Sequence, residues 1–420
     1  MAKLALTGGS PVRTRPFPRW PEFGEEERRA LLEAFEGGDW GGFPSPNTYA
    51  RQFNERFAAF HDARHGITAA NGTVTLEVAV RAAGLLPGDE VIMPAYTWIG
   101  TAAAVLFAQC VPVFVDSDPR NYCIDPAALE AAITPRTRAV MPVHLGMQFA
   151  DMDAILAVAR RHRLIVIEDC AHAHGGQWRG KGAGSIGDFG SFSLQTSKIL
   201  TAGEGGMIIT SNDEFAERCE SLINCGRPSR TDNYGYRAIG YNYRMTEFQA
   251  AILLAQLNRL PEQTERRWQN ARLLARKLDG IPGIAPMTWD ARITRPAIYH
   301  FLLRYSPEGF RDVHRDVFLM ALRAEGVPAD GPFYEPLYRA PLWQFRREEF
   351  AACATSNIDY QDMHCPVAEK AAYDESIWLH HPLLLGTEAD LDDIAGAVGK
   401  IQANADELAA IPRPEHKARL

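Results

Sequence analysis

The feature that most constrains the fold of this chain is an alternation of short apolar runs with helical stretches between residues 65 and 212. The runs are rich in β-branched residues, and the stretches between them keep helical spacing, as Leu76, Ala79 and Val80 do. This alternation predicts an α/β domain with a parallel sheet covered by helices. The predicted strands are Gly66–Ala70, Glu90–Pro94, Val111–Val115, Ala139–Val143, Leu164–Glu168, Gly190–Leu194 and Met207–Thr210.

The length of 420 residues suggests two or three domains. The segment Met245–Leu260 has apolar residues on more than one face, which predicts a long helix buried between domains or subunits. Proline and glycine cluster from Gly280 to Pro296, so a boundary is expected near residues 265 to 285. We therefore predict an N-terminal arm and large domain over residues 1–275, and a smaller domain over residues 276–420.

Charge and cysteine content limit the partners and the compartment. The net charge of -8 would repel a nucleic acid or an anionic membrane surface. Seven cysteines without a CxxC pair favour a reducing environment, and the first residues lack the apolar core of a signal peptide. The most apolar window, Ile99–Val115, is slightly too short to span a bilayer. We expect a cytoplasmic protein without nucleic-acid or membrane partners.

The first candidate site is Asn71-Gly72-Thr73, which follows a predicted strand and opens a helix. Free backbone N–H groups and the helix dipole favour a phosphate at such a place. Gly72 would allow close approach of the backbone, and the hydroxyl of Thr73 would add a donor. Because Asn-Gly is also a common turn dipeptide, a simple turn is the alternative interpretation.

The second candidate is the apolar strand that ends in Glu168 and Asp169. Ligands of α/β proteins bind at such strand ends, where a carboxylate can pair with a protonated pyridine nitrogen. Helix capping and metal binding are the alternatives for Asp169. His172 and His174 are two residues apart, so on a helix they would point in different directions, and we expect no metal shared between them.

The third candidate is Lys198, the lone lysine of the stretch Ser191–Gly206, which has few charged residues and lies between a strand and a glycine-rich turn. A lysine there would be partly desolvated and would have a lowered pKa, as an imine-forming amine needs. Ser193 is placed to add a hydroxyl to a phosphate site. Solvated lysines are far commoner than catalytic ones, so a surface lysine is the alternative.

The three candidates lie within a series of seven short sequence motifs. In their order along the chain, these are NGT, PAYTW, PVHL, EDCAHAHGG, SFSLQTSK, TAGEGG and GYNYRMTEFQAA. Together they resemble the DegT/DnrJ/EryC1/StrS aminotransferases, a branch of the fold-type I enzymes that use pyridoxal 5'-phosphate (PLP). The resemblance covers essentially the whole chain. It implies a large, mostly parallel-sheet domain with helices on both faces and a smaller α+β domain at the carboxyl end.

The resemblance also implies a role for individual residues. Lys198 would hold PLP as a Schiff base and move protons during amino transfer, and Asp169 would pair with the pyridinium nitrogen. His172 matches a residue that hydrogen-bonds the phenolic oxygen of the cofactor. Trp98 matches an aromatic residue that stacks on its ring.

The remaining matches concern the phosphate and the assembly. Gly72, Thr73 and Ser193 correspond to phosphate contacts of the family. Asn242 corresponds to an asparagine that reaches the phosphate in the neighbouring subunit. The resemblance therefore implies a homodimer with shared active sites.

Five further segments are most similar to the cyclitol subgroup of the family: Leu4–Pro21, Gly37–Gly42, Asn121–Pro126, Phe333–Arg339 and Ile377–Leu385. Members of this subgroup transfer the amino group of L-glutamine to scyllo-inosose or 2-deoxy-scyllo-inosose in aminoglycoside biosynthesis. Nucleotide keto-sugar aminotransferases and 3-amino-5-hydroxybenzoate synthases are the alternatives. Leu194-Gln195 replaces a common Phe-His, and HLGMQFADMD replaces a common HLYGQPADMD, so the pocket floor differs from the commonest pattern.

Four side chains of the C-terminal part could bind the hydroxyl groups of a polyol ring, although such residues more often pack in a core: Tyr334, Tyr338, His380 and His381. Two other classes of protein fit less well. Sugar dehydratases of the family carry histidine in place of the lysine, and a metal-dependent hydrolase would need an HExxH or HxxE spacing that the chain lacks.

Overall fold

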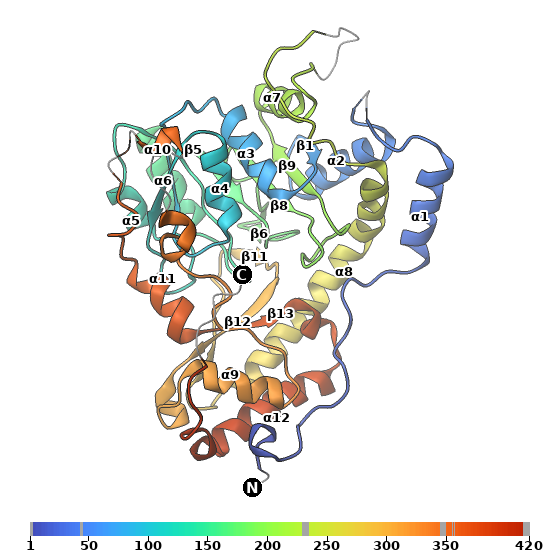
Figure 1. Ribbon diagram of the computed structural model, residues 1–420. Helices are drawn as coiled ribbons and strands as arrows, with labels where there is room; N and C mark the ends of the chain where they lie inside the picture. Colours follow the sequence, from blue (N-terminus) through green and yellow to red (C-terminus); the bar gives the residue numbers. More distant parts are fainter. Residues whose placement is uncertain are drawn as a thin grey trace.

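The computed structural model describes residues 3–42, 45–228, 235–344, 350–354, 356 and 358–414, and a seven-stranded sheet lies at its centre (Figure 1). The strands lie in the order β1-β9-β8-β5-β4-β2-β3. All seven predicted strands are present, with small displacements of their ends. Their bounds are β1 His65–Ala69, β2 Glu90–Pro94, β3 Val111–Val115, β4 Thr137–Val140, β5 Ile165–Asp169, β8 Phe189–Ser193 and β9 Gly206–Thr210.

The sheet is mostly parallel, and β9 is the reversed strand. It pairs antiparallel with both β8 and β1, whereas β8, β5, β4, β2 and β3 pair in parallel. Only the helix-free segment Leu194–Gly205 joins β8 to β9. A parallel crossover normally needs a helix, so this short segment returns the chain as a hairpin. The other strands consequently end at one common edge.

Helices cover both faces of the sheet, as predicted. The strands β2, β3 and β9 are buried at every position, which is typical of a sheet without a solvated face. Asparagine and aspartate side chains cap four of the helices, where they accept from the N–H groups of Val74, Ala127, Ala154 and Glu214. The covering helices are α2 Thr48–Phe60, α3 Gly72–Ala82, α4 Ile99–Phe107, α5 Pro126–Ala131, α6 Met152–His162 and α7 Asp213–Ile223.

The long helix α8, Glu247–Leu278, continues well beyond the predicted segment and through Pro261. A proline inside a helix costs about 3 kcal/mol because it removes a hydrogen bond. Packing offsets this cost, since α8 contacts α1 (Glu25–Glu36) and α2 along one part and α12 (Glu388–Ala403) along another. Figure 1 shows α8 running from the large sheet to the C-terminal region.

The C-terminal region contains a second, antiparallel sheet of β10 (Ile284–Pro286), β12 (His300–Tyr305) and β13 (Ser376–His380). Helices α9 (Arg315–Ala324) and α12 belong to the same region. Helix α10 (Ala351–Ala354) is drawn beside the large sheet in Figure 1, and the first N–H groups of α11 (Pro366–Lys370) donate to Asp116, which follows β3. A small third sheet pairs β11 (Ile293–Arg295) with β6 (Gln177–Trp178), which in turn pairs with β7 (Lys181–Gly182). The boundary at residues 275 and 276 stays a prediction.

The N-terminal arm packs on this C-terminal region before it reaches α1. Arg13 is buried and forms ion pairs with Asp390 and Asp393 of α12. The backbone N–H groups of Ala5 and Val12 donate to the carboxylate of Glu325. Among the described helices, none combines the length and the apolar character that a bilayer crossing requires.

Candidate active site

The predicted site residues gather at the edge where the parallel strands end. Gly72 and Thr73 follow β1, Trp98 follows β2, and Asp169 ends β5. Ser193 ends β8, and Lys198 lies in the loop to β9. Ligands of α/β proteins bind at this edge, so the fold brings the separate sequence motifs to one place.

Close backbone packing joins the phosphate-binding candidates. A Cβ atom on Gly72 would lie 2.7 Å from Cβ of Ser193, so only glycine allows this approach. A Cβ atom on Gly100 would lie 3.0 Å from Oγ1 of Thr73 and 2.9 Å from Cδ1 of Trp98. The first turn of α3, two hydroxyl groups and an indole therefore surround one small region, with the N–H donors that a phosphate needs.

Asp169 is 5% exposed, and both of its oxygens accept hydrogen bonds. Oδ2 accepts from Oγ1 of Thr101 at 2.9 Å, and Oδ1 accepts from the N–H of Ala171 at 3.1 Å. Burial raises the pKa of this carboxyl, against the opposing effects of these donors and of the Lys198 charge. A buried carboxylate of this kind is stabilised by a cation, and the protonated ring nitrogen of PLP would provide one.

Lys198 is half-buried, and its Nζ lies 4.4 Å from the centre of the Tyr299 ring. Burial lowers the pKa of this amine to about 8, although the charge of Asp169 opposes the shift. A useful fraction of the amine is therefore unprotonated near neutral pH, as imine formation requires. The structure thus supports the predicted desolvation of this lysine.

The loop that carries Lys198 is organised by the Gln195 that departs from the common family pattern. Oε1 of Gln195 accepts from the N–H and the hydroxyl of Ser197, at 2.8 and 2.7 Å. The hydroxyl of Ser197 also bonds the hydroxyl of Tyr299 at 2.7 Å. Gln195 and Tyr299 therefore both hold Ser197, the residue that precedes the lysine.

His172 and His174 have different partners. The ring of His172 stacks on Tyr299 at 4.1 Å, and its nitrogens lie 3.1 Å from the N–H of Gly146 and from the hydroxyl of Tyr334. Nε2 of His174 bonds the carbonyl oxygen of Ser193 at 2.7 Å. The two imidazoles therefore have separate partners and do not converge.

Two of the four candidate hydroxyl-binding residues lie at the site. Tyr334 bonds His172, and Nε2 of His381 bonds the carbonyl of Ser197 at 3.0 Å. Tyr338 is engaged elsewhere, since its hydroxyl donates to Glu369 at 2.8 Å. His380 bonds Asp330 and His300, at 2.8 and 3.0 Å.

Three residues of the site were not found from the sequence: Thr101, Tyr299 and Trp20. Thr101 lies in the first turn of α4, inside a window that is mostly apolar. Trp20 in the N-terminal arm donates to the carbonyl of Thr196 at 2.9 Å and packs edge-on against His381. Tyr299 and Trp20 come from distant segments, and no local pattern marks them.

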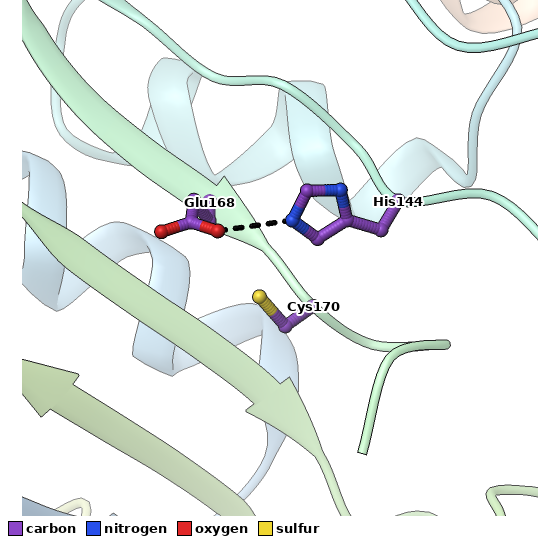
Figure 2. Close-up of side chains that lie close together, drawn as sticks. All are labelled: His144, Glu168 and Cys170. Carbon is purple, nitrogen blue, oxygen red and sulfur yellow. Dashed lines mark hydrogen bonds and ion pairs between the residues drawn. The ribbon is translucent and has the colours of Figure 1, made fainter. Parts of the chain in front are cut away.

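Figure 2 shows three buried side chains at the end of β5 whose ligand atoms lie within 4.8 Å of one another: His144, Glu168 and Cys170. Nε2 of His144 bonds Glu168 at 3.0 Å, and its Nδ1 accepts from the N–H of Ala150. Glu168 also accepts from three backbone N–H groups of residues 184–187. Burial raises the pKa of the Cys170 thiol. Hydrogen bonds therefore engage His144 and Glu168, and this pair braces the strand end.

The last of the predicted site residues is Asn242. It is exposed and forms a backbone bridge with Asn224. Exposed apolar side chains include Trp98, Phe107 and Tyr241, whose exposed fractions are 59, 51 and 37%. The role of Asn242 at the site of a second subunit stays a prediction.

The family model of the DegT/DnrJ/EryC1/StrS aminotransferase family matches residues 21–399. A relative from Streptoalloteichus tenebrarius, named "Putative L-glutamine:3-amino-2,3-dideoxy-scyllo-inosose aminotransferase", is 48% identical and covers 97% of this chain and 99% of its own. The L-glutamine:2-deoxy-scyllo-inosose aminotransferase of Micromonospora echinospora is 39% identical, with 97% and 100% coverage.

Solved structures show the same fold. A 3-amino-5-hydroxybenzoic acid synthase superimposes with a TM-score of 0.83 at 34% identity, over 93% of this chain and 100% of that protein. A Bacillus subtilis protein solved with its cofactor pyridoxamine phosphate has a TM-score of 0.77 at 26% identity, over 90% and 82% of the two chains.

Proposed function

The chain belongs to the DegT/DnrJ/EryC1/StrS aminotransferase family, and on this basis we propose that it transfers the amino group of L-glutamine to a keto-cyclitol with PLP as cofactor. The observation that carries the proposal is the half-buried amine of Lys198, with a lowered pKa, at the same sheet edge as buried Asp169. Groups of α3 and β8 that could donate hydrogen bonds to a phosphate lie at this edge too.

The residues present fit PLP. Gly72, Thr73 and Ser193 would hold the phosphate, Trp98 would cover the ring, and Asp169 would keep the ring nitrogen protonated. When bound, PLP supplies an electron sink for the negative charge that develops on the reacting carbon.

Lys198 is the proton carrier in this proposal. Its amine would remove the proton from the α-carbon of the amino donor and would return it in the next step, and it would move the proton the opposite way for the ketone acceptor. An amine whose pKa lies near the working pH can serve as base and as acid. Burial, which sets this pKa, therefore serves the chemistry directly.

The names of the relatives point to the acceptor. Three relatives at 48, 46 and 42% identity carry 3-amino-2,3-dideoxy-scyllo-inosose in their names. Relatives named for 2-deoxy-scyllo-inosose are 39 to 42% identical, and one named for scyllo-inosose is 38% identical. An amino-bearing keto-cyclitol of aminoglycoside biosynthesis is thus a third acceptor to test beside the two inososes. The likeness to a 3-amino-5-hydroxybenzoic acid synthase supports that reaction as the alternative.

The assembly and the compartment complete the proposal. The enzyme would act as a homodimer, in which Asn242 of each subunit reaches the phosphate at the site of the other. The exposed indole of Trp98 beside the site is consistent with cover from a second subunit or a substrate. All seven cysteines are unpaired, which fits a reducing cytoplasm.

The cofactor assignment is tested by absorption and by reductive trapping. Purified protein incubated with PLP should show the visible band of a lysine-bound cofactor, and borohydride should fix PLP to the peptide that contains Lys198. The Lys198→Ala variant should lose the covalent product, whereas Lys181→Ala, which changes an exposed lysine, should retain it. A colourless wild-type protein after PLP addition would refute the proposal.

A further inference from the structure

The hydrogen bonds of His172 determine which ring nitrogen carries its proton. The N–H of Gly146 donates to Nδ1 at 3.1 Å, so Nδ1 must offer a lone pair. Burial holds the pKa of His172 well below its ordinary value of 6.5, so the ring is neutral. The proton of the neutral ring therefore lies on Nε2.

The loop that fixes His172 is the one in which HLGMQ departs from the common family sequence. Gly146 has a φ of +66°, and a Cβ atom there would lie 2.9 Å from Cδ1 of Leu302. Its carbonyl oxygen accepts from the N–H of Tyr299, which stacks on His172. The glycine therefore lets this turn pack against Leu302 while its N–H and its carbonyl oxygen hold His172 and Tyr299.

The proton on Nε2 defines the direction of the Tyr334 hydroxyl. Nε2–H donates to Oη of Tyr334 at 3.1 Å, so the phenol accepts in this bond and its own proton points elsewhere. Burial raises the pKa of Tyr334, so the hydroxyl keeps that proton. Within the described part of the chain, the Tyr334 hydroxyl has no second hydrogen-bond partner.

Tyr334 lies between the aromatic residues that flank the proposed cofactor. Its ring is 6.3 Å from that of Trp98 and is almost parallel to that of His172, with 6° between the planes. Tyr299 stacks on His172, and the amine of Lys198 lies 4.4 Å from the centre of the Tyr299 ring. The Tyr334 hydroxyl is thus a hydrogen-bond donor in a fixed position at the site. Both nitrogens of His172 already have hydrogen-bond partners.

We propose that Tyr334, oriented by His172, donates the hydrogen bond to the phenolic oxygen of PLP, in place of the direct contact from His172 that the family resemblance implies. The inference rests on the proposed function, since it requires a bound PLP. In this arrangement His172 is a positioning residue, and Tyr334 is the residue that touches the cofactor.

The donated bond has a spectroscopic consequence in the resting holoenzyme. A donor to the phenolic oxygen stabilises its negative charge and so weakens its hold on the proton that it shares with the Lys198 linkage nitrogen. In Tyr334→Phe this proton should be held more tightly. We expect the pH midpoint of the visible band to rise by about one unit, a tenfold change in the proton equilibrium.

Two further variants make the experiment specific. Tyr305→Phe is the matched control, because this buried tyrosine donates to the carbonyl of Val313 in the C-terminal region, and its midpoint should equal that of the wild type. In a His172→Leu background the effect of Tyr334→Phe should shrink, because the two residues act as one unit. The absorption titration needs no substrate or turnover.

A second substitution should shift the pH midpoint in the opposite direction, and it can be tested even if Tyr334→Phe is unstable. Site-specific 3-fluorotyrosine at position 334 keeps the hydroxyl and makes it a stronger donor, so the midpoint should fall. Unchanged midpoints in both the phenylalanine and the fluorotyrosine proteins would overturn the inference, and the proposed function would stand. A wild-type protein without a visible band would instead refute the proposed function itself.

Discussion

At the scale of single residues, burial sets the chemistry of Lys198 more than any neighbouring charge does. The desolvated amine loses proton affinity, and the nearby carboxylate of Asp169 restores only part of it. The same burial raises the pKa of Asp169. Each group is therefore unfavourable as a lone ion, and a cofactor that bonds the amine and presents a cation to the carboxylate would relieve both costs.

The lowered pKa of Lys198 predicts the pH dependence of cofactor uptake. Only the unprotonated amine attacks PLP, and the folded-state pKa of about 8 lies below the ordinary 10.5. The rate of PLP attachment to the apoenzyme should therefore rise with pH to a plateau, with a midpoint near 8. Stopped-flow absorption at a series of pH values measures it. A midpoint near that of an ordinary lysine would contradict the desolvation argument.

The sequence identified those site residues that carry local signals. Lys198 stood out in a loop with few charged residues, and Asp169 at the end of an apolar strand. Tyr299 and Thr101 contact these residues only after the chain has folded, so neither spacing nor composition marks them. The hydrogen bonds that occupy both nitrogens of His172 likewise depend on segments far apart in the sequence.

At the scale of elements, strands were easier to predict than the connections between them. Fully buried strands appear as continuous apolar runs, whereas the reversal of β9 depends on a segment too short for a crossover. The end of α8 could not be located either, because its continuation beyond Pro261 depends on packing against α12.

Glu168 connects the end of β5 to the loop before β8. It is fully buried and accepts hydrogen bonds from Gly184, Ile186, Gly187 and His144. In Glu168→Ala one buried and two partly buried N–H groups would lose their acceptor, and buried His144 would lose its partner, which should lower the free energy of unfolding by about 3 to 5 kcal/mol.

Urea denaturation followed by circular dichroism measures this loss. The matched control is Glu130→Ala, which removes an exposed carboxylate paired with Arg161 and should leave the midpoint unchanged. Equal midpoints for the two variants would show that Glu168 does not brace the strand end.

At the scale of the whole molecule, distant parts of the chain meet around the site. The arm that carries Trp20 is anchored on α12 through Arg13, and α8 links the large sheet to the C-terminal region. The proposed dimer adds a second chain to this arrangement. Its site would combine Lys198 of one subunit with Asn242 of the other.

Hybrid dimers test that combination. Asn242→Asp should weaken PLP retention through repulsion of the phosphate, and Lys198→Ala should be inactive. Refolding the two variants together should restore about one quarter of wild-type activity, because half of the dimers would be hybrids with one intact site. A mixture of Lys198→Ala and Asp169→Ala is the control, since every hybrid site would then keep one lesion. Lack of recovery in the first mixture would exclude the shared site.

The central claim is amino transfer from L-glutamine to a keto-cyclitol through PLP on Lys198, and its most direct test is the pair of half-reactions. L-Glutamine added to the holoenzyme should bleach the visible band of the lysine-bound cofactor. After removal of the glutamine, scyllo-inosose, 2-deoxy-scyllo-inosose or 3-amino-2,3-dideoxy-scyllo-inosose should restore the band. A band that L-glutamine leaves unchanged, or that only a nucleotide keto-sugar restores, would contradict the account.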